Sequence, residues 1–169
     1  MFDFMKRLLK RNPKLKRHIS IIPIRNKSEE VILLMNKHKG REYLFPLNSN
    51  VNLSVDPLEA AQGLVATAFS GVTVNANEEV QKDSFFVKTN EFLHVATIVG
   101  KDVEETVYAI KLHDVRFDSI MGKEGKVRKV QAGKVVDLVL GHFRWLVPLA
   151  ISSYGGHWEV PVVKFKQQK

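Results

Sequence analysis

The spacing of hydrophobic and polar positions along the chain predicts many short strands and few helices. Three early apolar or alternating runs are typical of strands, at residues 18–25, 31–36 and 42–47. Four later runs follow the same pattern, at residues 72–74, 85–88, 92–100 and 105–112. Polar turns are predicted at residues 26–30 and 37–41. Strands interspersed with helices indicate an α/β (α+β) fold class.

Residues 56–71 carry the signals of a helix with two defined ends. Asp56 stands where an N-cap belongs, Pro57 at the first helical position, and Glu59 three residues after the cap. Gly71 stands where a C-terminal glycine would end the helix. A second helix is predicted over residues 132–145 from its apolar spacing, and residues 114–128 before it are predicted to form a polar loop.

Both ends of the chain are expected to extend from a central domain, with an arm at residues 1–17, the domain at 18–153 and a tail at 154–169. Met1–Arg11 has the pattern of a short basic amphipathic helix that Pro13 ends. Such a helix fits three roles: lying on an anionic membrane, docking on nucleic acid, or packing on its own domain. Pro161 limits the tail to an edge strand or to an arm that joins a partner's sheet. The tail residues expected to bind a partner are Trp158, Val160, Val162 and Phe165.

Length and composition predict one compact domain, since the chain has 169 residues, of which 44% are hydrophobic and 26% charged. The absence of cysteine excludes disulfides and thiolate metal sites, and is consistent with the cytoplasm or an equivalent reducing compartment. No apolar run has the length of a transmembrane helix, and the scattered cations of residues 1–17 do not resemble a secretory signal. We therefore expect an intracellular protein.

The net charge of +8 is concentrated in the arm, which carries seven of the basic residues against Asp3 alone. Basic residues in two other segments could join the arm in one phosphate-binding surface, although scattered solubilising charge fits the sequence equally well. Tyr43 and Phe45 are the nearby aromatic residues on which a base could stack. The cations expected to bind phosphate are Lys6, Arg7, Lys10, Arg11, Lys14, Lys16, Arg17, Lys37, Lys39, Arg41, Lys126, Arg128 and Lys129.

Other chemistry-bearing residues form no recognisable catalytic set. The six histidines show no metal-ligand spacing and no Ser-His-acid pattern. His94 is expected to complete a strand face as a neutral side chain. The pair Glu104 and Glu105 is expected in a solvated turn.

The order of elements and several motifs resemble the Nudix family over residues 18–146. Tyr43-Leu44-Phe45-Pro46 is similar to the family's aromatic-x-Pro segment, and Glu59-Ala60-Ala61 with Gly71-Val72 is similar to the second half of the Nudix box. The stretch from Glu124 through Val130 to Leu138 resembles the family's C-terminal layout. The resemblance implies an α/β/α sandwich with a mixed central sheet. In an active member it also implies hydrolysis of nucleoside-diphosphate compounds with Mg²⁺ or Mn²⁺.

The glutamates of the Nudix box are missing. With Gly71-Val72 as the anchor, Leu64-Val65 stands for Arg-Glu and Ala68-Phe69 for Glu-Glu. In any alignment, no acidic residue lies between Glu59 and Glu78. Mg²⁺ and Mn²⁺ prefer carboxylate oxygens, which an apolar helix does not supply. We therefore expect no catalytic residue, metal or cofactor, and an apolar helix that the chain's own segments or a partner cover.

These observations predict a catalytically inactive Nudix-like domain that acts as a binding or structural component of a larger assembly. Degenerate members of the family occur in ribonucleoprotein particles, so the resemblance implies protein partners and nucleic acid, with RNA favoured over DNA. One alternative is a divergent Mg²⁺- or Mn²⁺-dependent hydrolase that uses Asp56, Glu59 and Glu124. Another is attachment to a membrane through Met1–Arg11.

Overall fold

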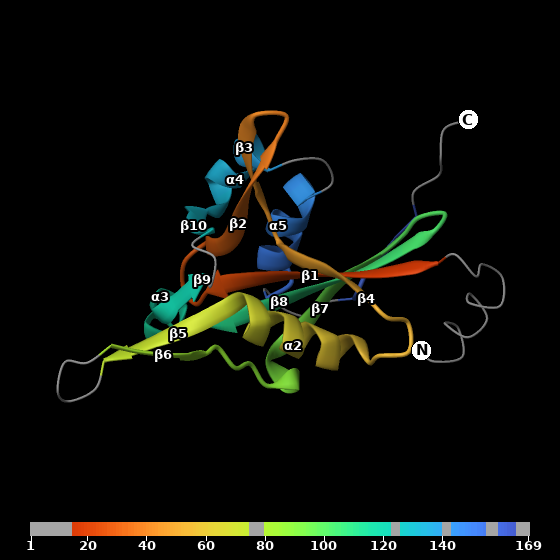
Figure 1. Cartoon of the computed structure of the whole chain (residues 1–169). Coiled ribbons are helices and arrows are strands. Elements are labelled where there is room, and N and C mark those ends of the chain that lie inside the picture. The colour runs from red at the N-terminus through yellow and green to blue at the C-terminus, as the bar shows by residue number, and fades with distance from the viewer. Residues whose placement is uncertain (1–14, 75–79, 123–125, 140–142, 155–158, 165–169) are drawn as a thin grey trace.

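The computed structural model describes residues 15–74, 80–122, 126–139, 143–154 and 159–164 (Figure 1). A large mixed sheet forms the centre of the molecule, with strands in the order β10-β2-β1-β8-β7-β11, while β3 pairs with β2 and β4 with β1. A second sheet has the order β6-β5-β9. The strands of the large sheet are β1 (Lys16–Arg25), β2 (Glu30–His38), β3 (Arg41–Phe45), β4 (Leu47–Val51), β7 (Phe92–Val99), β8 (Val103–Leu112), β10 (Val127–Gln131) and β11 (Val162–Lys164). Those of the second sheet are β5 (Phe69–Val74), β6 (Val80–Ser84) and β9 (Ile120–Gly122).

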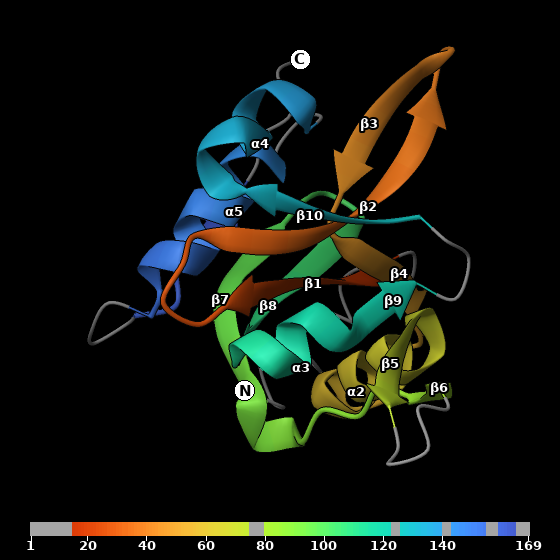
Figure 2. The ribbon, with the colours of Figure 1, turned by 90° about the vertical axis from the view of Figure 1, so that its left-hand side faces the viewer.

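Helices lie on both faces of the large sheet, so the architecture is an α/β/α sandwich (Figure 2). One face is covered by α4 (Ala132–Leu138) and α5 (Phe143–Ser152), which pack on one apolar core. The opposite face is covered by α2 (Pro57–Ala68), α3 (Asp114–Ser119) and the second sheet, which pack on another. A short 3₁₀ helix, η1 (Thr89–Glu91), precedes β7. Because side chains alternate along a strand, β1 and β8 supply both cores.

The first strand begins earlier than the sequence pattern predicts, which corrects the boundary of the arm. Lys16 and Arg17 belong to β1, where they lie opposite Val103 and Glu104 of the parallel strand β8. The Lys16 amide donates a hydrogen bond of 2.8 Å to the Asp102 carbonyl. The parallel strand β8 begins at Val103, opposite Lys16, so the pairing of the two strands includes Lys16 and Arg17, which the sequence pattern assigns to the arm.

The start of α2 is confirmed, and its predicted end is wrong. The Asp56 carboxylate accepts hydrogen bonds from the amides of Leu58 and Glu59, at 2.8 and 3.2 Å. The helix ends at Ala68, and Phe69 begins β5 with a fully buried side chain. Gly71 lies inside β5, opposite residues of both β6 and β9, and not at a helix terminus.

Residues 114–128, expected as a polar loop, instead contain α3, β9 and the start of β10. Phe117 anchors α3 because its ring is fully buried. Arg25 of β1 forms ion pairs with two carboxylates of α3, and its guanidinium lies 3.3 Å from the Asp114 carboxylate and 2.5 Å from that of Asp118. Contacts distant in sequence therefore order a segment whose local composition is polar.

Two further predictions are wrong in detail. Residues 85–88 are not a strand, since the strand here is β6, which ends at Ser84. The predicted helix at 132–145 is two helices, α4 and α5. The Arg144 guanidinium at the start of α5 donates a hydrogen bond of 2.8 Å to the Val139 carbonyl at the end of α4. A side chain thus satisfies a carbonyl that a continuous helix would have used internally.

The expectation of an edge strand in the tail is confirmed. β11 pairs in parallel with β7 and forms one end of the large sheet. Pro161 lies just before it, and its carbonyl accepts a hydrogen bond of 3.0 Å from the Thr97 amide. Val160 and Val162 remain 37% and 57% exposed. Trp158 and Phe165, like the arm residues 1–14 and Glu124, lie outside the described residues.

In the described part of the chain, no helix combines the length and the apolar character needed to cross a membrane.

Candidate functional site

Helix α2 stands where the resemblance to Nudix hydrolases would require metal-binding glutamates. Its inner face buries Ala61 and Val65 completely, and Leu64 and Ala68 pack at the edge of the same core. These side chains have no oxygen that could bind a cation. Across the described residues, no group of three or more His, Asp or Glu side chains is placed to hold a metal ion. The residues present on α2 therefore do not fit Mg²⁺ or Mn²⁺.

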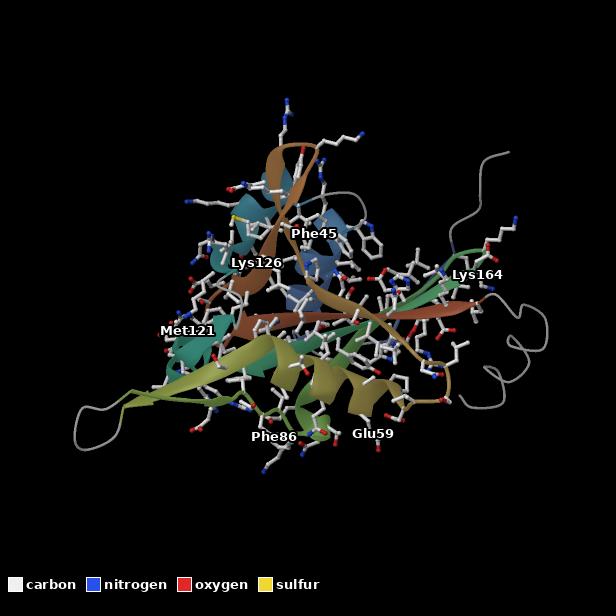
Figure 3. The ribbon with its side chains drawn as sticks, viewed as in Figure 1. Phe45, Glu59, Phe86, Met121, Lys126 and Lys164 are labelled. Atoms are coloured by element: carbon white, nitrogen blue, oxygen red, sulfur yellow. The ribbon has the colours of Figure 1, made fainter. Side chains whose placement is uncertain are left out.

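Two of the carboxylates named for the hydrolase alternative, Asp56 and Glu59, lie in the described part of the chain. Asp56 is engaged as the N-cap of α2. Glu59 is exposed and points from α2 away from the sheet (Figure 3). Glu124 lies outside the described residues.

A cavity of about 520 Å³ lies between the N-terminal end of α2 and the adjoining ends of β1, β7, β8 and β11; we call it the sheet-end cavity. Its volume falls in the range of small-molecule sites. Most of its wall is apolar, with Pro57, Leu58, Phe92, Val99, Val160 and Val162. The polar remainder comes from Arg17, Asp56, His94, Thr97, Glu104, Thr106 and Tyr108.

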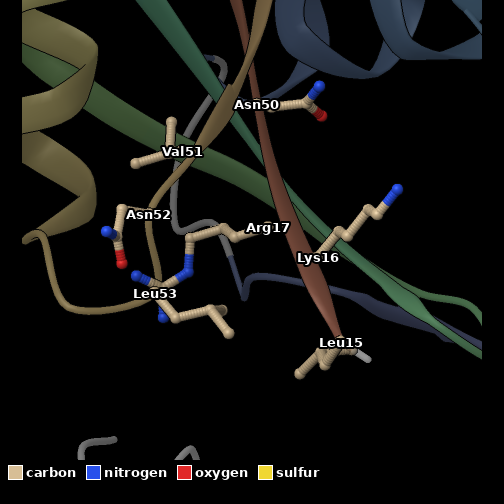
Figure 4. A pocket seen from close by; sticks show the side chains of 7 residues that line it. All are labelled: Leu15, Lys16, Arg17, Asn50, Val51, Asn52 and Leu53. Carbon is tan, nitrogen blue, oxygen red and sulfur yellow. The ribbon is translucent and has the colours of Figure 1, made fainter. Parts of the chain in front are cut away.

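Arg17 does not belong to an exposed basic arm, which corrects its expected role. Its side chain is 5% exposed and reaches from β1 to the loop after β4, past Asn52 and Leu53 (Figure 4). There Nη1 donates a hydrogen bond of 3.1 Å to the Val55 carbonyl. Its Nε is buried without a described hydrogen-bond partner. Arg17 also lines the adjacent, shallower pocket of about 370 Å³ drawn in Figure 4.

Three titratable side chains of the sheet-end cavity have shifted pKa values. Burial raises the pKa of Glu104, and the nearby Arg17 charge offsets part of that rise. Burial also raises the pKa of Tyr108 to about 12, with a further contribution from the Asp56 charge. Burial lowers the pKa of His94, whose Nε2 lies 3.0 Å from the Thr97 hydroxyl, in agreement with the neutral histidine expected there. Such a concentration of shifted groups in a cavity is a feature of binding and catalytic sites.

The sequence reading missed this cavity because it assigned Glu104 and Glu105 to a solvated turn. Both lie in β8 and are buried, at 5% and 7% exposure. They point to opposite faces of the sheet, and Glu105 accepts a hydrogen bond of 2.5 Å from the Ser20 hydroxyl. Residues 103–106 do not alternate between apolar and polar positions, so pairing with β1 and β7, and not a local pattern, extends the strand through both glutamates.

The β2–β3 hairpin presents the first group of predicted phosphate-binding cations. His38 pairs with Arg41, and the turn residues Lys39 and Gly40 have positive φ angles of 50° and 76°. Two consecutive positive φ values match a tight hairpin turn whose twist suits the flanking strands. Lys37, Lys39 and Arg41 are exposed on a hairpin that projects from the body of the molecule (Figure 2).

The second group lies on and beside β10, and the sheet brings part of it near the hairpin. β10 and β3 pair with adjoining segments of β2, and Arg128 reaches Met35 of β2 with an Nη2 to Sδ distance of 3.5 Å. Lys126 and Arg128 are exposed. Lys129 is directed at α3 instead, where Nζ donates a hydrogen bond of 2.8 Å to the Asp118 carbonyl. We call Lys37, Lys39, Arg41 and Arg128 the hairpin surface. Lys16 lies at the other end of β1 and does not join it.

A shallow groove of about 260 Å³ runs between β3 and β10 over Met35, with Tyr43, Leu44 and Val130 among its walls. Of the two aromatic candidates for base stacking, Phe45 packs edge-to-face on Phe143, with ring centroids 6.1 Å apart. Tyr43 is half-buried at the groove.

No protein-family model and no curated protein matches the sequence. Solved structures do match. A NUDIX hydrolase from Nitrosomonas europaea has a TM-score of 0.55 at 10% identity, over 89% of this chain and 80% of that chain. A structure from work on MutT of Aliivibrio salmonicida and Vibrio cholerae has a TM-score of 0.57 at 9% identity, over 81% and 98%. The C-terminal domain of mouse MUTYH, in complex with human PCNA, has a TM-score of 0.57 at 6% identity, over 85% and 92%.

Identities this low establish the fold and not the activity. The matches nevertheless extend over most of this chain, at 89% and 81% of its length for the first two structures. The chain therefore has a Nudix-like fold.

Proposed function

We propose that the chain is a non-hydrolytic Nudix-fold domain that binds nucleic acid, RNA in preference to DNA, within a larger assembly. The hairpin surface carries this proposal, because it holds exposed cations on elements that one sheet fixes relative to one another. Exposed cations on a rigid, projecting element can contact successive phosphates without reading sequence. The preference for RNA rests on the resemblance to degenerate family members in ribonucleoprotein particles.

The apolar face of α2 supports the non-hydrolytic part of the proposal. Hydrolysis of a diphosphate by metal ions needs carboxylates in fixed positions, and α2 has hydrocarbon side chains there. A role in an assembly is compatible with this fold, since the MUTYH domain that resembles it was solved with a protein partner. The arm cations of residues 1–14 would add further phosphate contacts, and the tail beside β11 would contact protein partners.

The test is binding of a fluorescent single-stranded RNA, measured by anisotropy at several salt concentrations. Four phosphate contacts predict that log K falls with log salt with a slope of about −2.8. Replacing three hairpin cations with glutamine should make that slope shallower by about 2. A matched control variant removes the same amount of charge from another part of the surface. The test variant carries Lys37→Gln, Lys39→Gln and Arg41→Gln. The control carries Lys88→Gln, Lys101→Gln and Lys164→Gln, at exposed positions before η1, between β7 and β8, and on β11.

Equal loss of binding in both variants would mean that only net charge matters, and would contradict a defined surface. A duplex DNA of the same length serves as competitor, and stronger binding to it would contradict the RNA preference. Nucleotide turnover with Mg²⁺ or Mn²⁺ that Glu59→Gln abolishes would establish the hydrolase alternative instead.

A further inference from the structure

The sheet-end cavity contains one buried cation and one buried anion that do not meet. Arg17 and Glu104 lie directly opposite each other on β1 and β8, and each is 5% exposed. The Arg17 guanidinium is turned toward the Val55 carbonyl. In the described part of the chain, Arg17 and Glu104 form no ion pair, although Arg17 is close enough to act on the charge of Glu104. Both side chains line the sheet-end cavity, which therefore carries a positive and a negative group in its wall.

Buried charges without hydrogen-bond partners are costly, so groups of this kind indicate a missing partner. Arg17 Nε has a hydrogen to donate and no described acceptor. Within the described residues, the carboxylate of Glu104 and the hydroxyl of Tyr108 also take part in no hydrogen bond. A matching ligand supplies an acceptor on the Arg17 side and a donor on the Glu104 side.

The rest of the cavity selects the body of that ligand. Leu58, Val99 and Val160 are apolar, and the rings of Phe92 and Tyr108 meet edge-to-face with centroids 5.9 Å apart. At about 520 Å³ the cavity has room for a large apolar group as well as a polar head.

The charges also decide which polar head fits. An anion without a positive group would face Glu104 and Asp56, and a cation without a negative group would face Arg17. A zwitterion places its carboxylate at Arg17 and its ammonium at Glu104, so both buried charges gain a charge-assisted hydrogen bond. We propose that the sheet-end cavity binds a free amino acid with a large apolar or aromatic side chain. This site is separate from the hairpin surface and does not depend on nucleic-acid binding.

The first test uses the unmodified full-length protein and calorimetric titration with three related molecules. L-Phenylalanine carries both charges, phenethylamine lacks the carboxylate, and 3-phenylpropanoate lacks the ammonium. We expect L-phenylalanine to bind, and each analogue to bind at least about tenfold more weakly, since each loses one charge-assisted hydrogen bond. Absence of binding by all three, or an analogue that binds as tightly as the amino acid, would overturn the proposal.

The second test assigns each charge to its partner. Glu104→Gln should weaken the binding of L-phenylalanine and phenethylamine but not that of 3-phenylpropanoate, which loses a like charge in the cavity wall. Arg17→Gln should weaken the binding of L-phenylalanine and 3-phenylpropanoate but not that of phenethylamine, which loses a like charge in the cavity wall. Glu59→Gln is the matched control, because Glu59 is an exposed carboxylate near the N-terminal end of α2 and does not line the cavity. Circular dichroism checks that each variant is folded. If the folded Glu104→Gln and Arg17→Gln variants lost affinity equally for all three ligands, the assignment of each charge to its partner would be refuted.

Discussion

At the scale of single residues, the acidic side chains of this chain have different roles, and the local sequence does not show which residue has which role. Asp56 caps a helix, Glu59 is solvated, and Glu104 and Glu105 are buried on opposite faces of one strand. Asp56 alone had a recognisable local pattern, since a cap followed by Pro57 and Glu59 is specific to a helix start. The burial of Glu104 depends on β1 and α2, which lie far from it in sequence.

Asp56→Ala should lower the free energy of unfolding by about 1 kcal/mol, because two amides at the start of α2 lose their acceptor. Asp56→Asn keeps a side-chain oxygen and should retain most of the stability. Urea unfolding followed by circular dichroism measures both. A loss in Asp56→Asn as large as that in Asp56→Ala would show that charge, and not capping, is the source.

The free energy of unfolding of the Glu104→Gln variant, relative to that of the unmodified protein, should increase as pH rises from about 4 to 7. Burial raises the pKa of Glu104 in the folded state above its ordinary value of 4.5. The folded protein therefore binds this proton more tightly than the unfolded chain, and ionisation at higher pH destabilises it. Urea unfolding at several pH values gives the difference between the two proteins. A difference that shrinks as pH rises would contradict the raised pKa.

At the scale of elements, those with strong local signals formed where the sequence predicts them. The hairpin of β2 and β3 and the start of α2 are examples, because their turn and cap residues act on their own neighbours. The helix α3 was missed, because it is held by the burial of Phe117 and by Arg25 of a distant strand. Gly71 was read as a helix end, whereas it is a strand residue between two pairing strands.

The same substitution should have opposite effects at two glycines. Gly63 lies in α2 with open space at its Cβ position, so Gly63→Ala should stabilise the protein by about 0.5–1 kcal/mol. Gly40 also has open space, but its φ is +76°, so Gly40→Ala should destabilise the hairpin by about 1 kcal/mol. Thermal unfolding measures both. A stabilising Gly40→Ala would show that the turn does not need its left-handed conformation.

At the scale of the whole molecule, two apolar cores on either side of one sheet hold the Nudix-like fold together. The fully buried residues of α2 contribute hydrocarbon to one of those cores. The same hydrocarbon side chains cannot also bind cations.

Mg²⁺ or Mn²⁺ should leave the Tm of the full-length protein unchanged relative to a sample with chelator. A ligand that binds the folded state raises the Tm as it saturates the protein, and the buried side chains of α2 have no oxygen to bind a cation. Differential scanning calorimetry is the measurement. A rise in Tm that disappears in Glu59→Gln would contradict this expectation.

The sequence by itself determined the fold class, the position of the hairpin, the start of α2, and the lack of any carboxylate on that helix after Glu59. Each of these follows from residue types within one turn or one strand, where local chemistry acts without distant partners. Only the tertiary structure decided that Arg17 and Glu104 share a cavity, that Lys129 turns to α3, and that the tail pairs with β7. These relations join segments far apart in the chain, and sheet pairing and burial establish them only once the whole domain has formed.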